Sequence, residues 1–503
     1  MQLTQKGKVS ALIYLASAIF SLMTVTYGFF PHLGISISLV IFTILAYHIK
    51  RDKNGYTKIF FAITLALSIL LSVRSQELVI LLDILGIVCF GSLMVIYDSH
   101  NKLTLFSVVS APILIMLKSS LIKSEYFLES TTSIDKSRRK ENTMNSVTIG
   151  LFTLVILAII LPLLASANPF FKEFVTNLID LIGLRNIKIT ESIFRWVMRV
   201  IIFFILAIFV PKIATLENKD NSFKLPFQES LNMLVPKIAV AIVLAIFFVT
   251  QIQLYFASPA TLQQLGYTYS RQVNEVFTQL SVVAFIALII LYGEKVSGKF
   301  NKILTIVLAV QGIFLTFMAY NSVYNYSNAW GFTYKRLYGF TVATWVLGLF
   351  LIYLYSFIKK TGKEIFLKTS VVFSGIILIL INLANFDYLI YHHRKAATGQ
   401  GVDYEYLSRL SSDSLSFDDQ LSELTKNSTQ EITEVQKNEA TDKGLWLLIY
   451  KIERLQKKYK DMDIRGFNLL EYLEYQKIKD IDTELLRNKY QLINPPGVYR
   501  QTR

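Results

Sequence analysis

Residues 320–339 read Y-N-S-V-Y-N-Y-S-N-A-W-G-F-T-Y-K-R-L-Y-G and lie between two apolar stretches of the chain. Asn321, Asn325 and Asn328 alternate here with tyrosine and tryptophan, and Lys335 and Arg336 come just before the apolar sequence resumes. Tyrosine and tryptophan are enriched at the level of the lipid headgroups. The stretch is therefore predicted to lie at a bilayer surface, between two membrane spans.

The composition is that of a polytopic membrane protein. Of 503 residues, 53% are hydrophobic and 17% are charged, and the mean hydropathy is +0.45. A soluble domain of this length is less apolar. The net charge of +15 comes from short basic clusters between apolar runs, so membrane topology explains it and no nucleic-acid partner is predicted. The single cysteine, Cys89, excludes an intrachain disulfide and a cysteine-based metal site.

The apolar runs predict an all-α protein with about 11–12 transmembrane helices, because ~20 helical residues cross a ~30 Å hydrocarbon core. The first series of runs is 9–30, 33–47, 59–73, 78–97, 103–117 and 147–167, and the second is 193–213, 238–256, 276–292, 303–320, 340–358 and 366–386. The first run is long enough to span, so no cleavable signal peptide is expected.

The distribution of lysine and arginine predicts the orientation, because short cytoplasmic loops carry the positive excess. In the second half every second connection is basic, namely those around 136–140, 219–224, 295–302 and 359–368. These connections are predicted to be cytoplasmic, which places residues 320–339 and everything after Phe386 outside. In the first half the charges conflict if every run crosses. The short run 103–117 contains Pro112, and a re-entrant or interfacial segment there would leave eleven crossings rather than twelve.

Four regions are predicted from these patterns. Residues 1–125 form an N-terminal transmembrane bundle, 126–146 a basic cytoplasmic loop, 147–388 a transmembrane core and 389–503 a polar helical C-terminal region. Within the core, Pro162 is expected to kink its helix. Apolar residues of 170–182 recur every four positions, which predicts an amphipathic helix in the membrane interface.

Helical spacing of leucine and isoleucine continues in the polar C-terminal region. One such face consists of Leu445, Leu448, Ile449, Ile452 and Leu455, and a second begins with Leu469, Leu470 and Leu473. This spacing is typical of amphipathic helices. Two or more such helices either pack into a small domain or lie against the membrane.

Polar residues within or beside the apolar runs are the candidates for a site. Asp83 lies about a turn and a half into its run, either as a functional carboxylate or as one paired between helices. Amides gather near the predicted outer ends of the runs, where they either form a vestibule or bridge helices. These amides are Asn168, Gln251, Gln253, Asn321, Asn325, Asn382 and Asn385.

The sequence contains none of the motifs that specify a nucleotide, zinc or serine-nucleophile centre. His392 and His393 follow the last run, but no other metal-ligating residues stand near them at helical spacing. No catalytic residue, metal or cofactor is predicted, and a non-enzymatic role is favoured.

Three stretches together resemble a bacterial family of multi-pass membrane proteins of unknown function, the DUF4153/DUF4173 group. Residues 164–171, L-A-S-A-N-P-F-F, are similar to its S-A-D-P-x-F signature, with Asn168 in place of Asp. Residues 331–338 resemble its Y-G-L-T-x-x-R-L-Y element and place Arg336 on that element's arginine. Residues 385–390 are similar to its N-P-D-x-x-I element, with Asn385 and Asp387 matching.

A further element of the family, D-x-x-Y-L-x-x-L-S-x-D, resembles residues 403–413. The resemblance covers roughly 147–415 and implies an architecture and a set of residues. It implies no reaction, and Asn168 argues against an essential carboxylate at that position.

Three functions fit these observations. The first is envelope-associated binding, sensing or assembly in a bacterial cytoplasmic membrane, with Lys335, Arg336, Asn385 and Asp387 organising the outer face, the basic pair facing the carboxylate. The second is a transporter of a small or lipidic solute. The third is an intramembrane enzyme acting on a lipid-linked substrate, with Asp387 and His392 as a base pair. The expected partners are the lipid bilayer and an envelope protein or lipid.

Overall fold

The computed structural model describes residues 5–26, 30–50, 52–97, 191–214, 298–395, 402–429, 436–460 and 462–489, with the shorter pieces 103, 108, 111–112, 237–242, 244–245, 248 and 283–292. The predictions on most of 103–117, on Pro162, on Asn168, on the amphipathic segment 170–182 and on Gln251 and Gln253 lie outside these residues.

Every element in the described part of the chain is helical, as predicted. The long helices are α1 (Gln5–Thr24), α2 (His32–Ile49), α3 (Gly55–Leu70), α4 (Glu77–Ile96), α9 (Glu191–Ala214), α13 (Lys299–Trp330), α14 (Tyr334–Ile358) and α15 (Lys363–Ala384). Each overlaps one of the predicted apolar runs.

Five of the described helices are long and apolar enough to cross a membrane. They are His32–Ile49, Glu77–Ile96, Lys299–Asn328, Tyr334–Ile358 and Lys363–Ala384. Shorter apolar helices occur at Ala11–Thr24, Gly55–Leu70 and Val283–Tyr292. The chain is thus a polytopic α-helical membrane protein, and the total of eleven or twelve crossings stays a prediction.

Residues 320–339 are predicted to connect two membrane spans, but most of them are part of the helices themselves. Helix α13 continues through Trp330, and only residues 331–333 separate it from α14. Its 32 residues span about 48 Å, which exceeds the ~30 Å hydrocarbon core. The polar end is held by packing, since Val323 and Ser327 are buried against neighbouring residues, each 4% exposed. The hydroxyl of Ser327 is satisfied by the carbonyl of Val323 at 2.8 Å.

The chain divides into two compact units, Met1–Lys50 with Leu114–Glu217 and Arg51–Ile113 with Asn218–Arg503. In the first unit, α1 packs against both α2 and α9. The guanidinium of Arg199 in α9 donates to the carbonyl of Val25 at 3.2 Å. It also lies over the ring of Trp196, at 4.9 Å from the centroid.

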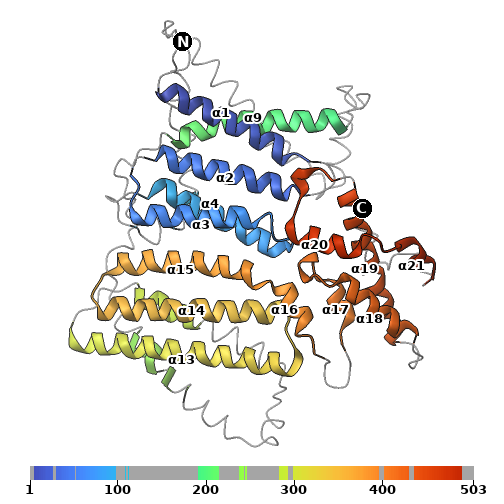
Figure 1. Cartoon of the computed structure of the whole chain (residues 1–503). Helices are drawn as coiled ribbons and strands as arrows, with labels where there is room; N and C mark the ends of the chain where they lie inside the picture. The colour runs from blue at the N-terminus through green and yellow to red at the C-terminus, as the bar shows by residue number, and fades with distance from the viewer. Residues whose placement is uncertain are drawn as a thin grey trace, which may run out of the picture. The chain divides into compact units, whose positions relative to one another are not determined.

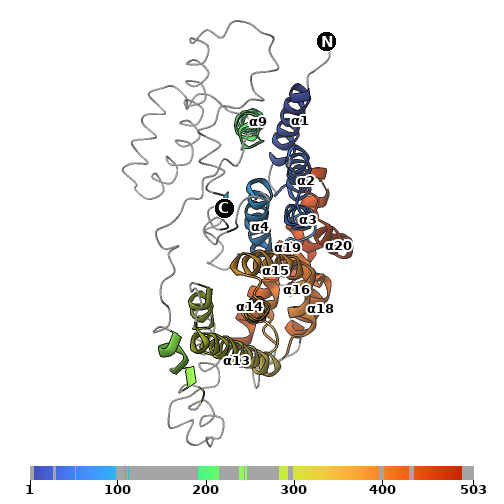
Figure 2. The same cartoon turned by 90° about the vertical axis from the view of Figure 1, so that its left-hand side faces the viewer.

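In the second unit, α3 and α4 form a helical hairpin, and α13, α14 and α15 pack in sequence beside it (Figures 1 and 2). Helix α15 contacts both helices of the hairpin. Glycines allow these close approaches. A Cβ on Gly375 of α15 would come within 2.7 Å of Ile63 in α3 and 2.9 Å of Phe90 in α4.

The C-terminal part of the second unit is a small helical domain, here called the tail domain, built from α17 (Tyr404–Ser408), α18 (Phe417–Thr429), α19 (Gln436–Lys460), α20 (Leu469–Ile478) and α21 (Thr483–Lys489). Figure 1 shows it in orange to red beside the ends of α15 and α16 (Phe386–His392). The predicted face of α19 is confirmed, since Leu445, Leu448, Ile449, Ile452 and Leu455 are all in its core.

The second predicted face, which begins with Leu469, Leu470 and Leu473, is not buried in the core of the tail domain. Helix α20 exists, but Leu469 is 41% exposed and Leu473 44% exposed. The helix buries Glu474 and Ile478 instead, both at 0% exposure. The carboxyl group of Glu474 at this core position accepts from the backbone N–H of Phe417, at the start of α18, at 2.5 Å.

Close packing between α13 and α14 yields a first prediction. A Cβ on Gly312 would come within 2.2 Å of the ring of Phe350, which is 0% exposed. Gly312→Ala is expected to lower the free energy of unfolding by about 1–3 kcal/mol, because overpacking displaces a ring that has no free space. Thermal unfolding in detergent measures this change in the free energy of unfolding. Gly55→Ala is the control, since a Cβ there meets nothing within 4 Å, and equal effects of the two substitutions would contradict the packing.

Candidate functional site at the head of the α3–α4 hairpin

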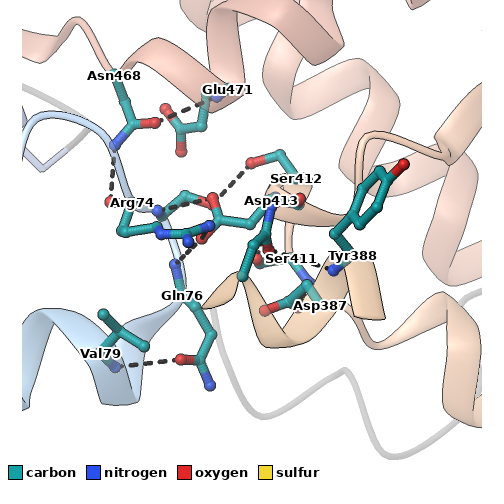
Figure 3. A network of polar contacts seen from close by, with 12 residues as sticks. Arg74, Gln76, Val79, Asp387, Tyr388, Ser411, Ser412, Asp413, Asn468 and Glu471 are labelled. Atoms are coloured by element: carbon teal, nitrogen blue, oxygen red, sulfur yellow. Dashed lines mark hydrogen bonds and ion pairs between the residues drawn. The ribbon is translucent and has the colours of Figure 1, made fainter. Parts of the chain in front are cut away.

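A polar network gathers at the turn between α3 and α4, and its members come from segments far apart in the sequence (Figure 3). Arg74 and Gln76 in this turn are buried, at 5% and 9% exposure. Gln76 caps α4 by accepting from the backbone N–H of Val79 at 3.2 Å. Its side-chain oxygen also accepts from the hydroxyl of Tyr338 in α14, at 3.3 Å. The turn is thereby connected to a second membrane helix.

Asp413 is the centre of this network. It stands in the short 3₁₀ turn η3 (Ser412–Ser414) and is 1% exposed. One carboxylate oxygen accepts from the backbone N–H of Ser75 at 2.9 Å and from its hydroxyl at 2.6 Å. The other accepts from the N–H of Gln76 at 3.3 Å and lies 3.9 Å from the guanidinium of Arg74. A single carboxylate thus satisfies several buried donors of the hairpin turn.

The segment after the last span holds Asp413 in place. Asn385 has a left-handed backbone, with φ of 44°, and caps α16 by accepting from the N–H of Tyr388 at 3.2 Å. Its side-chain N–H donates to the carbonyl of Asp413 at 2.8 Å. Asp387, 2% exposed, accepts from the N–H of Ser411 at 2.8 Å and from the hydroxyl of Tyr334. The structure therefore brings two predicted site residues, Asn385 and Asp387, into one network.

The tail domain binds the same turn from a second direction. The side-chain N–H of Asn468, before α20, donates to the carbonyl of Arg74 at 2.7 Å. The backbone N–H of Leu469 donates to the carbonyl of Ser72 at 2.9 Å. In α19, the ammonium of Lys451 donates to the carbonyls of Ser408 and Leu410 at 2.6 and 2.7 Å. The bonds of Lys451 lie within the tail domain. The bonds of Asn468 and Leu469 fix the tail domain to the end of the hairpin.

Burial shifts the pKa values of the ionisable groups in this network. Burial raises the pKa of Asp413 to about 6, and the neighbouring charge of Asp387 adds to the effect. Burial likewise raises the pKa of Asp387, and it lowers the pKa of Lys451 to about 8. The pKa of Arg74 is lowered by burial against the opposing attraction of Asp413. The charge of the network is thus sensitive to pH over the neutral range.

Arg336 and Lys335 take a different role from the predicted one. The guanidinium of Arg336 donates to the carbonyls of Trp330 and Gly331 at 3.0 and 2.5 Å, and it lies 4.1 Å from the ring centroid of Tyr326. It therefore caps the C-terminus of α13, where a cation is favourable, whereas Lys335 is exposed.

The predicted pairing of these cations with Asp387 is wrong for the described residues. The donors to Asp387 are Tyr334 and Ser411. Tyr334 and Arg336 are two positions apart in α14, so their side chains point about 160° away from each other around the helix. The tyrosine therefore faces the network while the arginine faces α13.

Asp387 and His392 do not form a catalytic pair. Both lie in α16, and their spacing of five positions corresponds to about 140° around the helix. Asp387 points into the network, while His392 is exposed and stacks on Tyr388 with 3.8 Å between ring centroids. Within the described ranges, no group of three His, Cys, Asp or Glu residues could hold a metal ion.

The sequence patterns do not predict the residues of the hairpin turn. Arg74, Ser75 and Gln76 stand between two apolar runs, and an arginine beside polar residues is the only signal there. Asp413 falls in a stretch that resembles the family element, although the resemblance gives it no role. Asn468 carries no signal, because its partner Arg74 lies 394 positions away.

The family model described as a domain of unknown function, DUF4153, matches residues 59–421. The chain belongs to the DUF4153 family. The match begins well before residue 147, where the motif resemblance starts, and it covers both the hairpin turn and Asp413. Asn468 and Lys451 lie beyond it. No curated protein and no solved structure matches the chain.

The network yields a second prediction, at Asp413. Asp413→Asn replaces one acceptor oxygen by an amide nitrogen, which is itself a donor. At least one buried donor of the hairpin turn is then left without an acceptor. We expect the free energy of unfolding to fall by about 1–3 kcal/mol, measured by thermal unfolding in detergent. Asp419→Asn, at an exposed position of α18, is the matched control and should unfold like the unmodified protein. Equal unfolding of all three would show that Asp413 does not hold the turn.

A third prediction concerns pH and the buried Glu474 of the tail domain. Burial raises the pKa of Glu474 from 4.5 to about 7. The folded state therefore holds this proton more tightly than the unfolded state, so the stability is complete below pH 4.5 and is lost as pH rises through 7. The loss amounts to about 3 kcal/mol at neutral pH.

Glu474→Gln keeps an acceptor for the N–H of Phe417 but cannot ionise. Its melting temperature should fall less between pH 4.5 and 7 than that of the unmodified protein, with Asp387 and Asp413 causing the remaining slope. Melting curves recorded across this pH range in detergent measure the difference. Parallel curves for both proteins would mean that Glu474 is already ionised in the folded state.

Proposed function

We propose that this membrane protein acts in envelope-associated binding, sensing or assembly, and that its tail domain contacts the partner. The observation that carries this proposal is the buried carboxylate of Asp413, which joins the tail domain to the α3–α4 hairpin. The alternative enzymatic role loses its proposed residue pair, because His392 is exposed and stacks on Tyr388 instead of facing Asp387.

The network supports coupling between the tail domain and the membrane helices. Displacing the tail domain would break the bonds to Ser72, Arg74, Ser75 and Gln76 together. Each buried polar group left without a partner costs about 1–3 kcal/mol. A partner that moves the tail domain therefore also moves the hairpin turn, and through Gln76 and Tyr338 it acts on α14. This connection is what a membrane sensor or assembly factor requires.

The charges at the opposite end of the second unit support an outward-facing tail domain. Helices α3, α13 and α15 all begin at the end far from the network. Their first two turns and the residues before them are rich in lysine, comprising Lys53, Lys58, Lys299, Lys302, Lys359, Lys360, Lys363 and Lys368. A lysine-rich end is expected to be cytoplasmic. The network and the tail domain would then lie outside, where an envelope protein or lipid can reach them.

A single crosslinking experiment tests the location and the partner together. In a Cys89→Ser background, Gln476→Cys places a thiol on the exposed side of α20, and Lys359→Cys places one at the opposite end of the membrane helices. Intact cells are treated with a membrane-impermeant maleimide that carries a photo-crosslinking group. We expect labelling and a discrete crosslinked envelope component with Gln476→Cys, and no labelling with Lys359→Cys until the cells are lysed.

The Asp413→Asn substitution then tests the coupling. Added to Gln476→Cys, it is expected to reduce the crosslinked product about 5-fold or more, in the range of ordinary coupling free energies, while Asp419→Asn leaves the yield unchanged. Labelling of Lys359→Cys in intact cells with protection of Gln476→Cys would contradict the orientation. A labelled tail domain that yields no discrete product would contradict the partner role.

A further inference from the structure

A second polar site lies deeper in the membrane bundle, between α4 and α15. Asp83 is 0% exposed and Asn382 is 2% exposed. The side-chain N–H of Asn382 donates to one carboxyl oxygen of Asp83 at 2.7 Å. Asp83 is six positions after the first residue of α4, which corresponds to about 9 Å along the helix axis. This pair is therefore separate from the network at the hairpin head.

One oxygen atom on each residue of this pair lacks a hydrogen-bond partner. The amide nitrogen of Asn382 also donates to the carbonyl of Leu378 at 3.1 Å, so both of its hydrogens are used. The second carboxyl oxygen of Asp83 and the amide oxygen of Asn382 are buried and have no partner among the described residues. Both are acceptors, and a donor is missing from the site.

We propose that Asp83 is a proton-binding site, with the neutral carboxyl and the amide of Asn382 forming a doubly hydrogen-bonded acid–amide pair. One proton on the second carboxyl oxygen turns it from acceptor to donor, and the amide oxygen of Asn382 is the acceptor that lacks a partner. A single proton thus satisfies both atoms. It also removes a charge whose burial among membrane helices is costly.

A proton fits this site better than a metal cation. Around the neighbouring Gly86, the side chains of Leu67 and Leu378 approach within 2.8 and 3.0 Å of the Cβ position. These neighbouring side chains are apolar and supply no further oxygen ligand. Hard cations of the calcium type take about 6–8 oxygen ligands, whereas this pair offers two free oxygens.

Two other ionisable groups interact with Asp83 from the surrounding elements. Arg74 in the α3–α4 turn attracts the charge of Asp83, and the charge of Asp83 acts on the hydroxyl of Tyr338 in α14. The ion pair of Arg74 is with Asp413, at 3.9 Å. Loss of the proton would create a second carboxylate that competes with Asp413 for Arg74. Proton binding at Asp83 would therefore affect the ion pair of Arg74 with Asp413 at the hairpin head.

Infrared spectroscopy of the purified protein at pH 7 tests this proposal. A neutral carboxyl group absorbs at a frequency where a carboxylate does not. We expect Asp83→Asn to remove the absorption of one protonated carboxyl group, and Asp419→Asn, at an exposed position, to remove none. The amide introduced by Asp83→Asn can still pair with Asn382 through two hydrogen bonds, so this variant retains the neutral contact.

Asn382→Leu is a second variant for the same measurement, and it does not require Asp83→Asn to fold. Asn382→Leu retains the carboxyl of Asp83 but removes its acceptor. The same absorption should then shift to the higher frequency of a carboxylic acid without a hydrogen bond. An unchanged protonated-carboxyl absorption in Asp83→Asn, or an unshifted one in Asn382→Leu, would overturn the proposal. Neither measurement depends on a binding partner of the tail domain.

Discussion

The carboxylate of Asp413 is almost completely buried, and four donors of the hairpin turn surround it. A buried carboxylate is tolerated only where hydrogen bonds and a nearby cation replace its water. The hairpin turn depends equally on Asp413, because the donors of Ser75 and Gln76 would have no acceptor without its carboxylate. This mutual requirement determines where the tail domain packs against the helices of the second unit and which residues reach the end of those helices.

The surrounding packing allows this arrangement. Glycines in α13, α14 and α15 let side chains of neighbouring helices approach the backbone, as at Gly312 with Phe350 and Gly348 with Phe373. Close approach favours helix association in lipid, where burial of apolar surface gives little advantage. Helix α15 then holds Asn382 against Asp83 in α4 and delivers Asn385 to the network. The same helix therefore positions both polar sites.

The class of the protein and most of its described helices follow from the amino-acid sequence alone. Apolar runs and helical spacing are local properties, and burial in lipid or in a core acts directly on them. For the same reason the buried face of α19 is predictable. The family resemblance also draws attention to Asn385 and Asp387, although it does not say what they contact.

Which polar groups meet depends on the tertiary structure. Asp413 and Ser75 are 338 positions apart, and Asn468 and Arg74 are 394 apart, so no local pattern relates them. The burial of Glu474 in α20 and the choice of Tyr334 over Arg336 as the partner of Asp387 have the same origin. Hydrophobic periodicity specifies that a face is buried, whereas hydrogen-bond partners are selected by the three-dimensional position of each donor and acceptor.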